Sequence, residues 1–308
     1  MILRLTTVIT LSVASAACER APGALGHLPA PTPQLFAPGV VSTDAREYGI
    51  AFTPSGTVAY FTRRLRQRRA GSQILVTRFV EGAWTEPELA SFSTDRDEAP
   101  FITADGERML FSSRRFVTGS LDRSPNIWVM ERTSDGWSDP SPLEGVVNQP
   151  RGEIDDFTTG SESGPVLLAD GSLLYWTAAN PEWGNDVYVA DPDASGAFMN
   201  PRPLRLNSYG DESNPAMSPD GRYLIFQGYR DARGIGEQDL YAVERTTYGW
   251  SDPWLLPAPI NSERSDGYPS FSPDGRYFFF ASDRDARAGI YSIYYVDVQA
   301  LGLEIETR

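Results

Sequence analysis

Lysine is absent from this sequence of 308 residues, and cysteine and histidine each occur once. The 27 basic residues are therefore all arginine. Without lysine, Schiff-base chemistry and Ser-Lys catalysis are excluded. The single cysteine, Cys18, and the single histidine, His27, both lie near the N-terminus. Nucleophilic triads and histidine metal sites are therefore not expected in the rest of the chain.

Basic residues are also outnumbered. The chain carries 27 arginines against 41 acidic residues, which gives a formal net charge of −14 at pH 7. Proteins that bind nucleic acid present basic surfaces, so this balance argues against a nucleic-acid partner. The hydrophobic fraction of 41% is ordinary for a soluble globular protein.

The apolar stretch at the N-terminus is short. Residues 1–17 combine one basic residue, Arg4, with an apolar run and small residues at the end, which predicts a secretory signal peptide rather than a membrane span. Cys18 follows at once, in a position that resembles the acceptor of bacterial lipoproteins, although Ser15 stands where a leucine-like residue is usual. Glu19 at the next position favours the outer membrane over the inner one.

Two locations are compatible with this N-terminus. If Cys18 is lipidated, we expect an outer-membrane lipoprotein that faces the periplasm or the cell surface and touches the membrane only through its lipid. Otherwise we expect a secreted or periplasmic protein. Residues 18–32 are rich in proline, alanine and glycine and predict a semi-extended, lipoprotein-type tether. The folded domain is expected over residues 33–308.

A turn recurs through this domain. Its glycines, each preceded by Ser or Asp, are Gly56, Gly106, Gly171, Gly221 and Gly275. The steps between them are 50, 65, 50 and 54 residues. Asp-Gly and Ser-Gly tolerate the positive φ angles of hairpin turns. Each turn is followed by two short strands and, in four copies, by an aromatic residue and a proline, so each repeat predicts a four-stranded β-propeller blade.

The fifth copy lacks an outer strand of its own. No aromatic residue and proline follow its last strand, at residues 290–296. Residues 33–42, PQLFAPGVVS, align with residues 253–262, PWLLPAPINS, in the fourth copy. We therefore predict that the N-terminal segment completes the last blade and closes the ring, which protects strand edges from aggregation. The expected fold class is all-β, a single propeller of five four-stranded blades.

The fourth and fifth copies carry a family resemblance. The pattern DExxPxxSPDGRYLxF, followed by RD, DLYxxxR and GWSDPxxLxxxINS, is similar to the TolB-type, WD-like propeller repeats of bacterial envelope proteins. The resemblance covers residues 33–298. It implies the propeller fold but no single function, because such propellers serve as partner platforms, sensors and occasionally enzymes.

Acidic residues lie at the start of the inner strand in every copy. They are Glu47, Asp97, Glu98, Asp155, Asp156, Asp211, Glu212 and Asp266. Similar positions repeated around a ring would place these carboxylates at the mouth of the central channel. The loops after the second strands reach the same face and are rich in arginine.

Three roles remain open for these carboxylates. An arginine after a second strand, such as Arg284, can pair with a carboxylate of a neighbouring inner strand and clamp adjacent blades. A carboxylate ring can instead hold Ca²⁺, which prefers oxygen ligands, and no other cofactor is expected. A carboxylate pair can also hydrolyse a glycosidic bond, as acid and base or nucleophile.

Two features break the symmetry of the repeat. Five arginines gather after the second strand of the first copy: Arg63, Arg64, Arg66, Arg68 and Arg69. On an acidic protein they form a candidate binding face for an anionic polymer or an acidic partner surface, the alternative being a solvated loop. In the third copy, Trp183 lies where other copies have arginines, and it is a candidate for stacking on a sugar or peptide, or else a buried side chain.

We expect a non-catalytic envelope propeller that presents a loop face to an envelope protein or to cell-wall glycan. The alternative is a glycosidase-like enzyme that uses a pair of the acidic residues at the channel mouth. Its candidates are Asp155, Asp156, Asp211, Glu212 and Asp266. The two hypotheses differ in whether two carboxyl groups stand alone about 5–10 Å apart or each is neutralised by an arginine.

Overall fold

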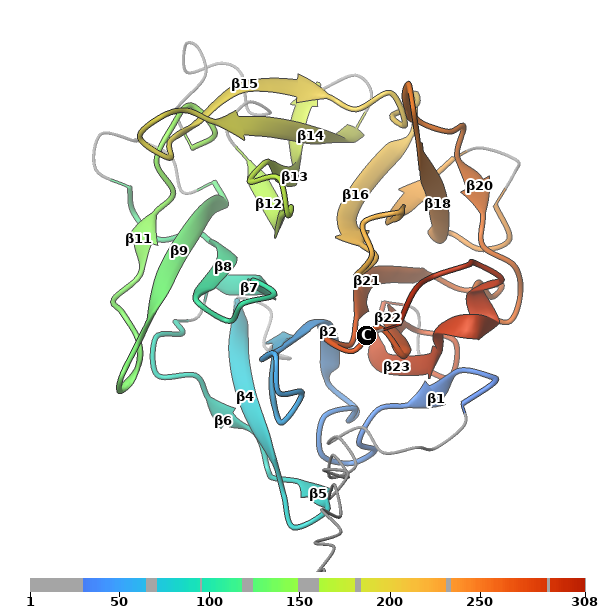
Figure 1. Cartoon of the computed structure of the whole chain (residues 1–308). Coiled ribbons are helices and arrows are strands. Elements are labelled where there is room, and N and C mark those ends of the chain that lie inside the picture. The colour runs from blue at the N-terminus through green and yellow to red at the C-terminus, as the bar shows by residue number, and fades with distance from the viewer. Residues whose placement is uncertain are drawn as a thin grey trace, which may run out of the picture.

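The computed structural model describes residues 30–64, 71–94, 96–117, 124–148, 161–180, 184–230, 234–286 and 289–307. The strands of these segments form five antiparallel sheets around a central axis (Figure 1). Each sheet is one blade of a propeller, so the predicted five-bladed fold is confirmed. Within these segments, no helix has the length and apolar character needed to cross a membrane.

The blades, numbered 1 to 5 along the chain, share one strand order from the axis outwards. The inner strands are β2 (Arg46–Phe52), β7 (Asp97–Ile102), β12 (Glu162–Leu167), β16 (Asp211–Met217) and β21 (Asp266–Phe271). The second strands are β3 (Val58–Arg64), β8 (Arg108–Ser113), β13 (Leu173–Asn180), β17 (Tyr223–Tyr229) and β22 (Tyr277–Ser282). The third strands are β4 (Ser72–Val80), β9 (Asn126–Thr133), β14 (Gly184–Pro192), β18 (Asp239–Thr246) and β23 (Ser292–Asp297).

The outer positions are filled by shorter strands. In blades 1 to 4 they are β5 (Ala83–Trp84) with β6 (Glu88–Leu89), β10 (Gly136–Trp137) with β11 (Ser141–Pro142), β15 (Phe198–Pro203), and β19 (Gly249–Trp250) with β20 (Trp254–Leu255). In blade 5 the outer strand is β1 (Gln34–Leu35), where Gln34 faces Tyr295 of β23. The N-terminal segment therefore closes the ring, as the sequence predicts.

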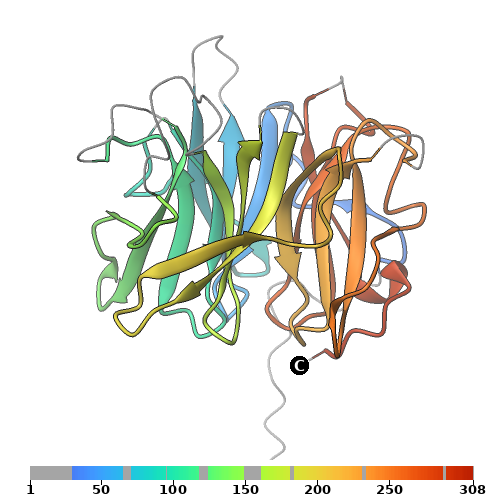
Figure 2. The same ribbon diagram turned by 90° about the horizontal axis from the view of Figure 1, so that it is seen from above.

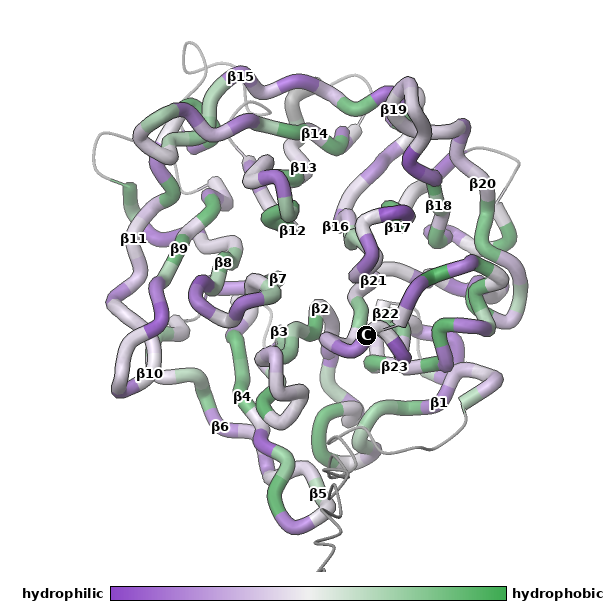
Figure 3. Tube along the Cα trace, viewed as in Figure 1, coloured by the Kyte–Doolittle hydropathy of each residue, from purple (hydrophilic) through white to green (hydrophobic). Residues whose placement is uncertain are grey.

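The hydrophobic core lies between blades rather than inside any one of them. One cluster joins Phe36 and Phe279 of blade 5 to Phe52 and Phe61 of blade 1, and four others span the remaining pairs of neighbours. Because both faces of a blade pack on a neighbour, its middle strands are continuous apolar runs. Figure 3 shows such a hydrophobic stretch along β4.

Every inner strand is interrupted at the same place by a β-bulge. The residues at the bulge are Gly49, Ala99, Gly164, Asn214 and Tyr268, with φ between 48° and 60°. At each of them the register with the second strand shifts. A bulge bends a strand and re-aims its side chains, so the second half of each inner strand is turned towards the axis.

The two ends of the ring carry different connections. The turn face holds the five glycine turns, and the loop face holds the segments that enter the inner strands. Both described ends of the chain lie at the turn face. The amide of Asp297, at the end of β23, donates to Ala30 O at 2.8 Å, and the amide of Glu306, beyond the short helix η2 (Val298–Leu301), donates to Asp220 Oδ2 at 3.0 Å. Figure 2 shows the C-terminus on the lower side of the ring.

Candidate functional site

Four of the acidic residues singled out in the sequence occupy one equivalent position at the loop face. Glu47, Asp97, Glu212 and Asp266 stand at the start of their inner strands, and each is 0% exposed. In blade 3 this position belongs to Glu162, which is also buried. Asp155 and Asp156, which we expected there, lie outside the described residues.

Glu162 was missed because the insertion before it holds other acidic residues. A spacing signal identifies it: in blades 2 to 5 the buried acid is followed three residues later by proline. The pairs are Asp97 and Pro100, Glu162 and Pro165, Glu212 and Pro215, and Asp266 and Pro269. The proline follows the bulge residue directly, so the spacing reports the position of the bulge.

In blades 1, 2, 4 and 5, the loop that precedes the inner strand donates hydrogen bonds to this carboxylate. The hydroxyl of Thr43 donates to Glu47 at 2.5 Å and its amide at 3.3 Å. Ser208 holds Glu212 in the same way, at 2.5 and 2.9 Å. Thr94 caps Asp97 and Ser262 caps Asp266. These hydrogen bonds stabilise a carboxylate that burial removes from water.

An arginine at the end of the second strand, or just beyond it, neutralises the same four carboxylates. The N···O distances are 2.9 Å for Arg63 and Glu47, 2.8 Å for Arg115 and Asp97, 3.5 Å for Arg230 and Glu212, and 2.7 Å for Arg284 and Asp266. The expected pairing with a neighbouring blade is wrong in one respect, because each ion pair lies within a single blade. In blades 1, 2 and 5 the guanidinium also donates to main-chain carbonyls of the segment that arrives from the preceding blade, as Arg63 does with Val40 O at 3.1 Å.

Aromatic rings complete the surroundings of these arginines. Arg284 Cζ lies 5.0 Å from the ring centre of Phe280 and 5.2 Å from that of Tyr294. Arg115 and Arg230 stack on two rings each and Arg63 on one. Burial lowers the pKa of Arg115, although the charge of Asp97 acts in the opposite direction. Burial raises the pKa of Glu47, although the hydrogen bonds from Thr43 and the charge of Arg63 lower it. These groups are thus arranged as structural clamps.

The candidate basic face is only partly described. Arg63 is held by Glu47 and by linker carbonyls, whereas Arg64 is exposed at the end of β3. Arg66, Arg68 and Arg69 lie outside the described residues, as does Trp183. Cys18 and residues 1–29 lie outside them too.

Glu98 and Asp211 are sequence neighbours of the clamped carboxylates Asp97 and Glu212, and their contacts differ from those of these two residues. Glu98 accepts hydrogen bonds from Tyr48 Oη at 2.8 Å and Ser72 Oγ at 3.1 Å. The ring centre of Tyr48 is 4.4 Å from that of Tyr268. Burial, then the charge of Glu98, raises the pKa of Tyr48 well above its ordinary value, so this hydroxyl stays protonated.

Tyr268 adopts its backbone conformation at an energetic cost. Its φ of 52° is unusual for a bulky residue, and the equivalent residues of the other blades are Gly, Ala or Asn. Left-handed backbone costs about 1–2 kcal/mol for such a side chain. Its ring packs against Tyr48 and Tyr291, and the three tyrosines form a cluster where blades 1 and 5 meet. The sequence analysis missed this tyrosine cluster, since Tyr268 reads only as one more residue before a proline.

One carboxylate pair carries no arginine among the described residues. Asp186 lies in β14. Its pKa is raised, mainly by burial and to a smaller extent by the charge of Asp211. Asp211 Oδ1 accepts the amide of Asn185 at 2.9 Å. Asp186 was not singled out in the sequence. Elsewhere in the described part of the chain, no three acidic, histidine or cysteine side chains gather in a way that could hold a metal ion.

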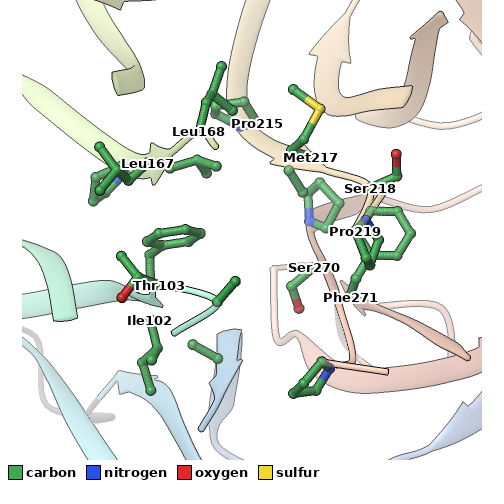
Figure 4. A pocket seen from close by; sticks show the side chains of 18 of the residues that line it. Ile102, Thr103, Leu167, Leu168, Pro215, Met217, Ser218, Pro219, Ser270 and Phe271 are labelled. Carbon is green, nitrogen blue, oxygen red and sulfur yellow. The ribbon is translucent and has the colours of Figure 1, made fainter. Parts of the chain in front are cut away.

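An apolar cavity of about 690 Å³ occupies the channel towards the turn face. It is lined by the second halves of the inner strands and by the turns that follow them. Figure 4 shows Ile102, Leu167, Leu168, Met217 and Phe271 around this common space. Asp105, Asp170 and Asp220 of the turns line it as well, together with Arg245, which lies 3.5 Å from Asp170. Three carboxylates against one guanidinium leave the rim with a net negative charge.

No protein-family model matches the chain, and no curated protein sequence matches it. Similarity is found among solved structures. TolB from Acinetobacter baumannii is 16% identical with a TM-score of 0.50, over 83% of this chain and 53% of TolB, so the chain spans about half the length of that protein. A protein assigned as TolB from Agrobacterium tumefaciens is 20% identical with a TM-score of 0.52, over 86% and 81% of the two chains.

Glycoside hydrolases share the architecture equally well. A thermostable family-43 glycoside hydrolase is 14% identical with a TM-score of 0.55, over 83% of this chain and 91% of that enzyme. At these identities the likeness shows the fold alone. The structural neighbours are therefore divided between TolB propellers and hydrolases, and function has to be argued from the site.

Proposed function

We propose that the chain is a non-catalytic binding propeller of the bacterial cell envelope, which takes a protein segment at the apolar cavity of its turn face. One observation carries the proposal. The inner-strand carboxylates of blades 1, 2, 4 and 5 are buried, capped and paired with arginine. A catalytic acid or base must reach the substrate with a free proton site, and these groups are occupied by structural contacts.

The cavity supports a protein segment rather than a glycan as the ligand. Its volume of about 690 Å³ is within the usual range for ligand sites. Its walls offer Leu168, Met217 and Phe271, whereas a buried glycan needs a hydrogen-bond partner for each hydroxyl. The acidic rim favours an apolar segment that is flanked by basic residues.

The described part of the chain begins at this face. Ala30 lies beside the end of β23, on the turn face. A lipid on Cys18 would therefore anchor the ring on the same side as the cavity. We propose that the cavity of the anchored protein takes partner segments that lie close to the outer membrane.

Photo-crosslinking in the source bacterium tests the proposal. A crosslinking residue at position 217, inside the cavity, is expected to capture one envelope protein. The same residue in place of Tyr248, which is 96% exposed on the outer edge, is expected to capture none. The capture should be lost on Leu168→Glu and kept on Leu89→Glu, because Leu89 is on an outer strand and 49% exposed. Equal capture from both positions would contradict the proposal.

A glycosidase is the second candidate, and the Asp186 and Asp211 pair is the observation that favours it. A raised pKa suits Asp186 to a general acid, with Asp211 as the second carboxyl group. Release of reducing sugar from cell-wall or plant glycans by the purified protein tests this reading. Activity that is lost in both Asp186→Asn and Asp211→Asn, with folding intact, would replace the binding proposal.

A further inference from the structure

A polar pocket lies on the loop face, at the opposite end of the axis from the apolar cavity. Its volume is about 540 Å³, and it is formed by blades 1, 4 and 5. Its chemistry is set by Arg46, Asp211, Tyr229, Glu237, Gln238 and Tyr291. The tyrosine cluster touches both spaces, because Tyr291 lines the pocket while Tyr268 lines the cavity.

Arg46 differs from the clamp arginines because, within the described residues, it forms no ion pair with an inner-strand carboxylate. Its Cζ lies 4.7 Å from the ring centre of Tyr291 and 5.5 Å from that of Tyr48. Its Nε is buried and has no hydrogen-bond partner among the described residues. The same is true of Nη1 in Arg115 and Arg230, so the buried Nε is not what makes Arg46 a binding group. Arg46 lines the pocket, and a guanidinium held on aromatic rings binds a carboxylate, which accepts hydrogen bonds from it at short range.

The surroundings fix this guanidinium in place. The amide of Glu47, the residue after Arg46, donates to Tyr291 O at 2.9 Å. The hydroxyl of Tyr291 donates to Gln238 Oε1 at 3.4 Å. Arg46 and Tyr291 are therefore held together before a ligand arrives, which lowers the entropic cost of binding.

Acidic groups face the same space. Asp211 is half-buried and held by the amide of Asn185, and Glu237 is exposed at the rim. The pocket thus offers one cation and two anions. A ligand with one carboxylate and two ammonium groups neutralises all three.

We propose that this pocket binds a diamino monocarboxylic acid. The carboxylate lies against Arg46, the ammonium groups lie against Asp211 and Glu237, and the alkyl chain packs on Tyr291 and Tyr229. The inference is independent of the proposed function, because the pocket and the apolar cavity lie at opposite ends of the axis.

Titration calorimetry with L-lysine as the probe tests this site in the purified protein. Saturable binding is expected with L-lysine and not with cadaverine, which lacks the carboxylate, or hexanoate, which lacks both ammonium groups. Arg46→Gln and Asp211→Asn should each weaken binding at least tenfold, which corresponds to about 1.4 kcal/mol. Arg78→Gln should bind as the wild type does, because Arg78 is exposed on β4, away from the pocket.

Three outcomes overturn the inference. One is the absence of saturable binding with L-lysine. Another is unchanged affinity in an Arg46→Gln protein whose circular dichroism and unfolding midpoint match the wild type. The third is binding of the neutral sugar D-xylose in place of L-lysine, which would instead support the glycosidase candidate.

Discussion

The guanidinium of Arg284 lies 2.7 Å from Asp266 Oδ1 and also donates to the main-chain oxygens of Pro259 and Ile260. The ion pair is internal to blade 5, whereas the two carbonyls belong to the segment that arrives from blade 4. One side chain therefore fixes a carboxylate, a strand end and an inter-blade linker. The ion pair recurs in blades 1, 2 and 4, and the contact with a linker carbonyl recurs in blades 1 and 2. Such repetition is what a structural role requires, since a catalytic site needs to be formed only once.

Ring closure by the N-terminal segment predicts a large effect of Phe36→Ala. Phe36 is 3% exposed, and its ring centre lies 5.3 Å from those of both Trp84 and Phe279. Loss of a buried phenylalanine costs about 3–5 kcal/mol of unfolding free energy. Urea unfolding measures it, with Leu35→Ala as the control, because Leu35 is the preceding residue, at the end of β1, and is 36% exposed. Equal losses in the two variants would argue against closure.

The raised pKa of Glu47 predicts a specific pH dependence. The folded protein holds this proton more tightly than the unfolded chain, so stability from Glu47 is fully present below the ordinary pKa of 4.5 and is lost as pH rises through the raised value. In Glu47→Gln this contribution is absent. The unfolding free energy of the wild type minus that of the variant should therefore fall as pH rises from 4.5. A difference that grows with pH would show that Arg63 outweighs burial.

The inner-strand bulge predicts different costs for two glycine substitutions. An alanine Cβ at Gly164, with φ of 60°, would lie 2.8 Å from Trp176, whereas one at Gly56, with φ of 69°, would meet nothing within 4 Å. Both variants lose about 1–2 kcal/mol to the left-handed backbone, and Gly164→Ala loses about 1–3 kcal/mol more to steric strain. Thermal unfolding of both proteins measures the difference. Equal shifts would mean that Trp176 moves aside freely.

Local patterns in the sequence were sufficient for the fold. The turns at Gly221 and Gly275 and the aligned segments 33–42 and 253–262 predict five blades and their closure, because a blade is built from neighbouring strands. The partner of Glu47 was harder to assign. Glu47 faces Arg63 across β2 and β3, and this register depends on a bulge that the sequence analysis did not identify.

The candidate sites were less predictable because they combine distant blades. Met217 and Leu168 line the channel. Apolar residues of the same kind fill the core between blades, and the periodicity of apolar residues in the sequence does not distinguish the two environments. Arg46 and Tyr291 meet only because the ring closes, so their pocket has no local signature. Glu162 was the exception, since its spacing to Pro165 was visible in the sequence.

A double-mutant cycle on Asp266 and Arg284 tests the structural role of the carboxylates most directly. Asp266→Asn and Arg284→Gln should each lower the unfolding free energy by about 3–5 kcal/mol, because each leaves a buried partner uncompensated. The double variant should lose less than the two single losses combined, with a coupling of about 0.5–3 kcal/mol. An Asp266→Asn protein that is as stable as the wild type or more stable would contradict the account, since stability gained on removal marks a residue kept for function.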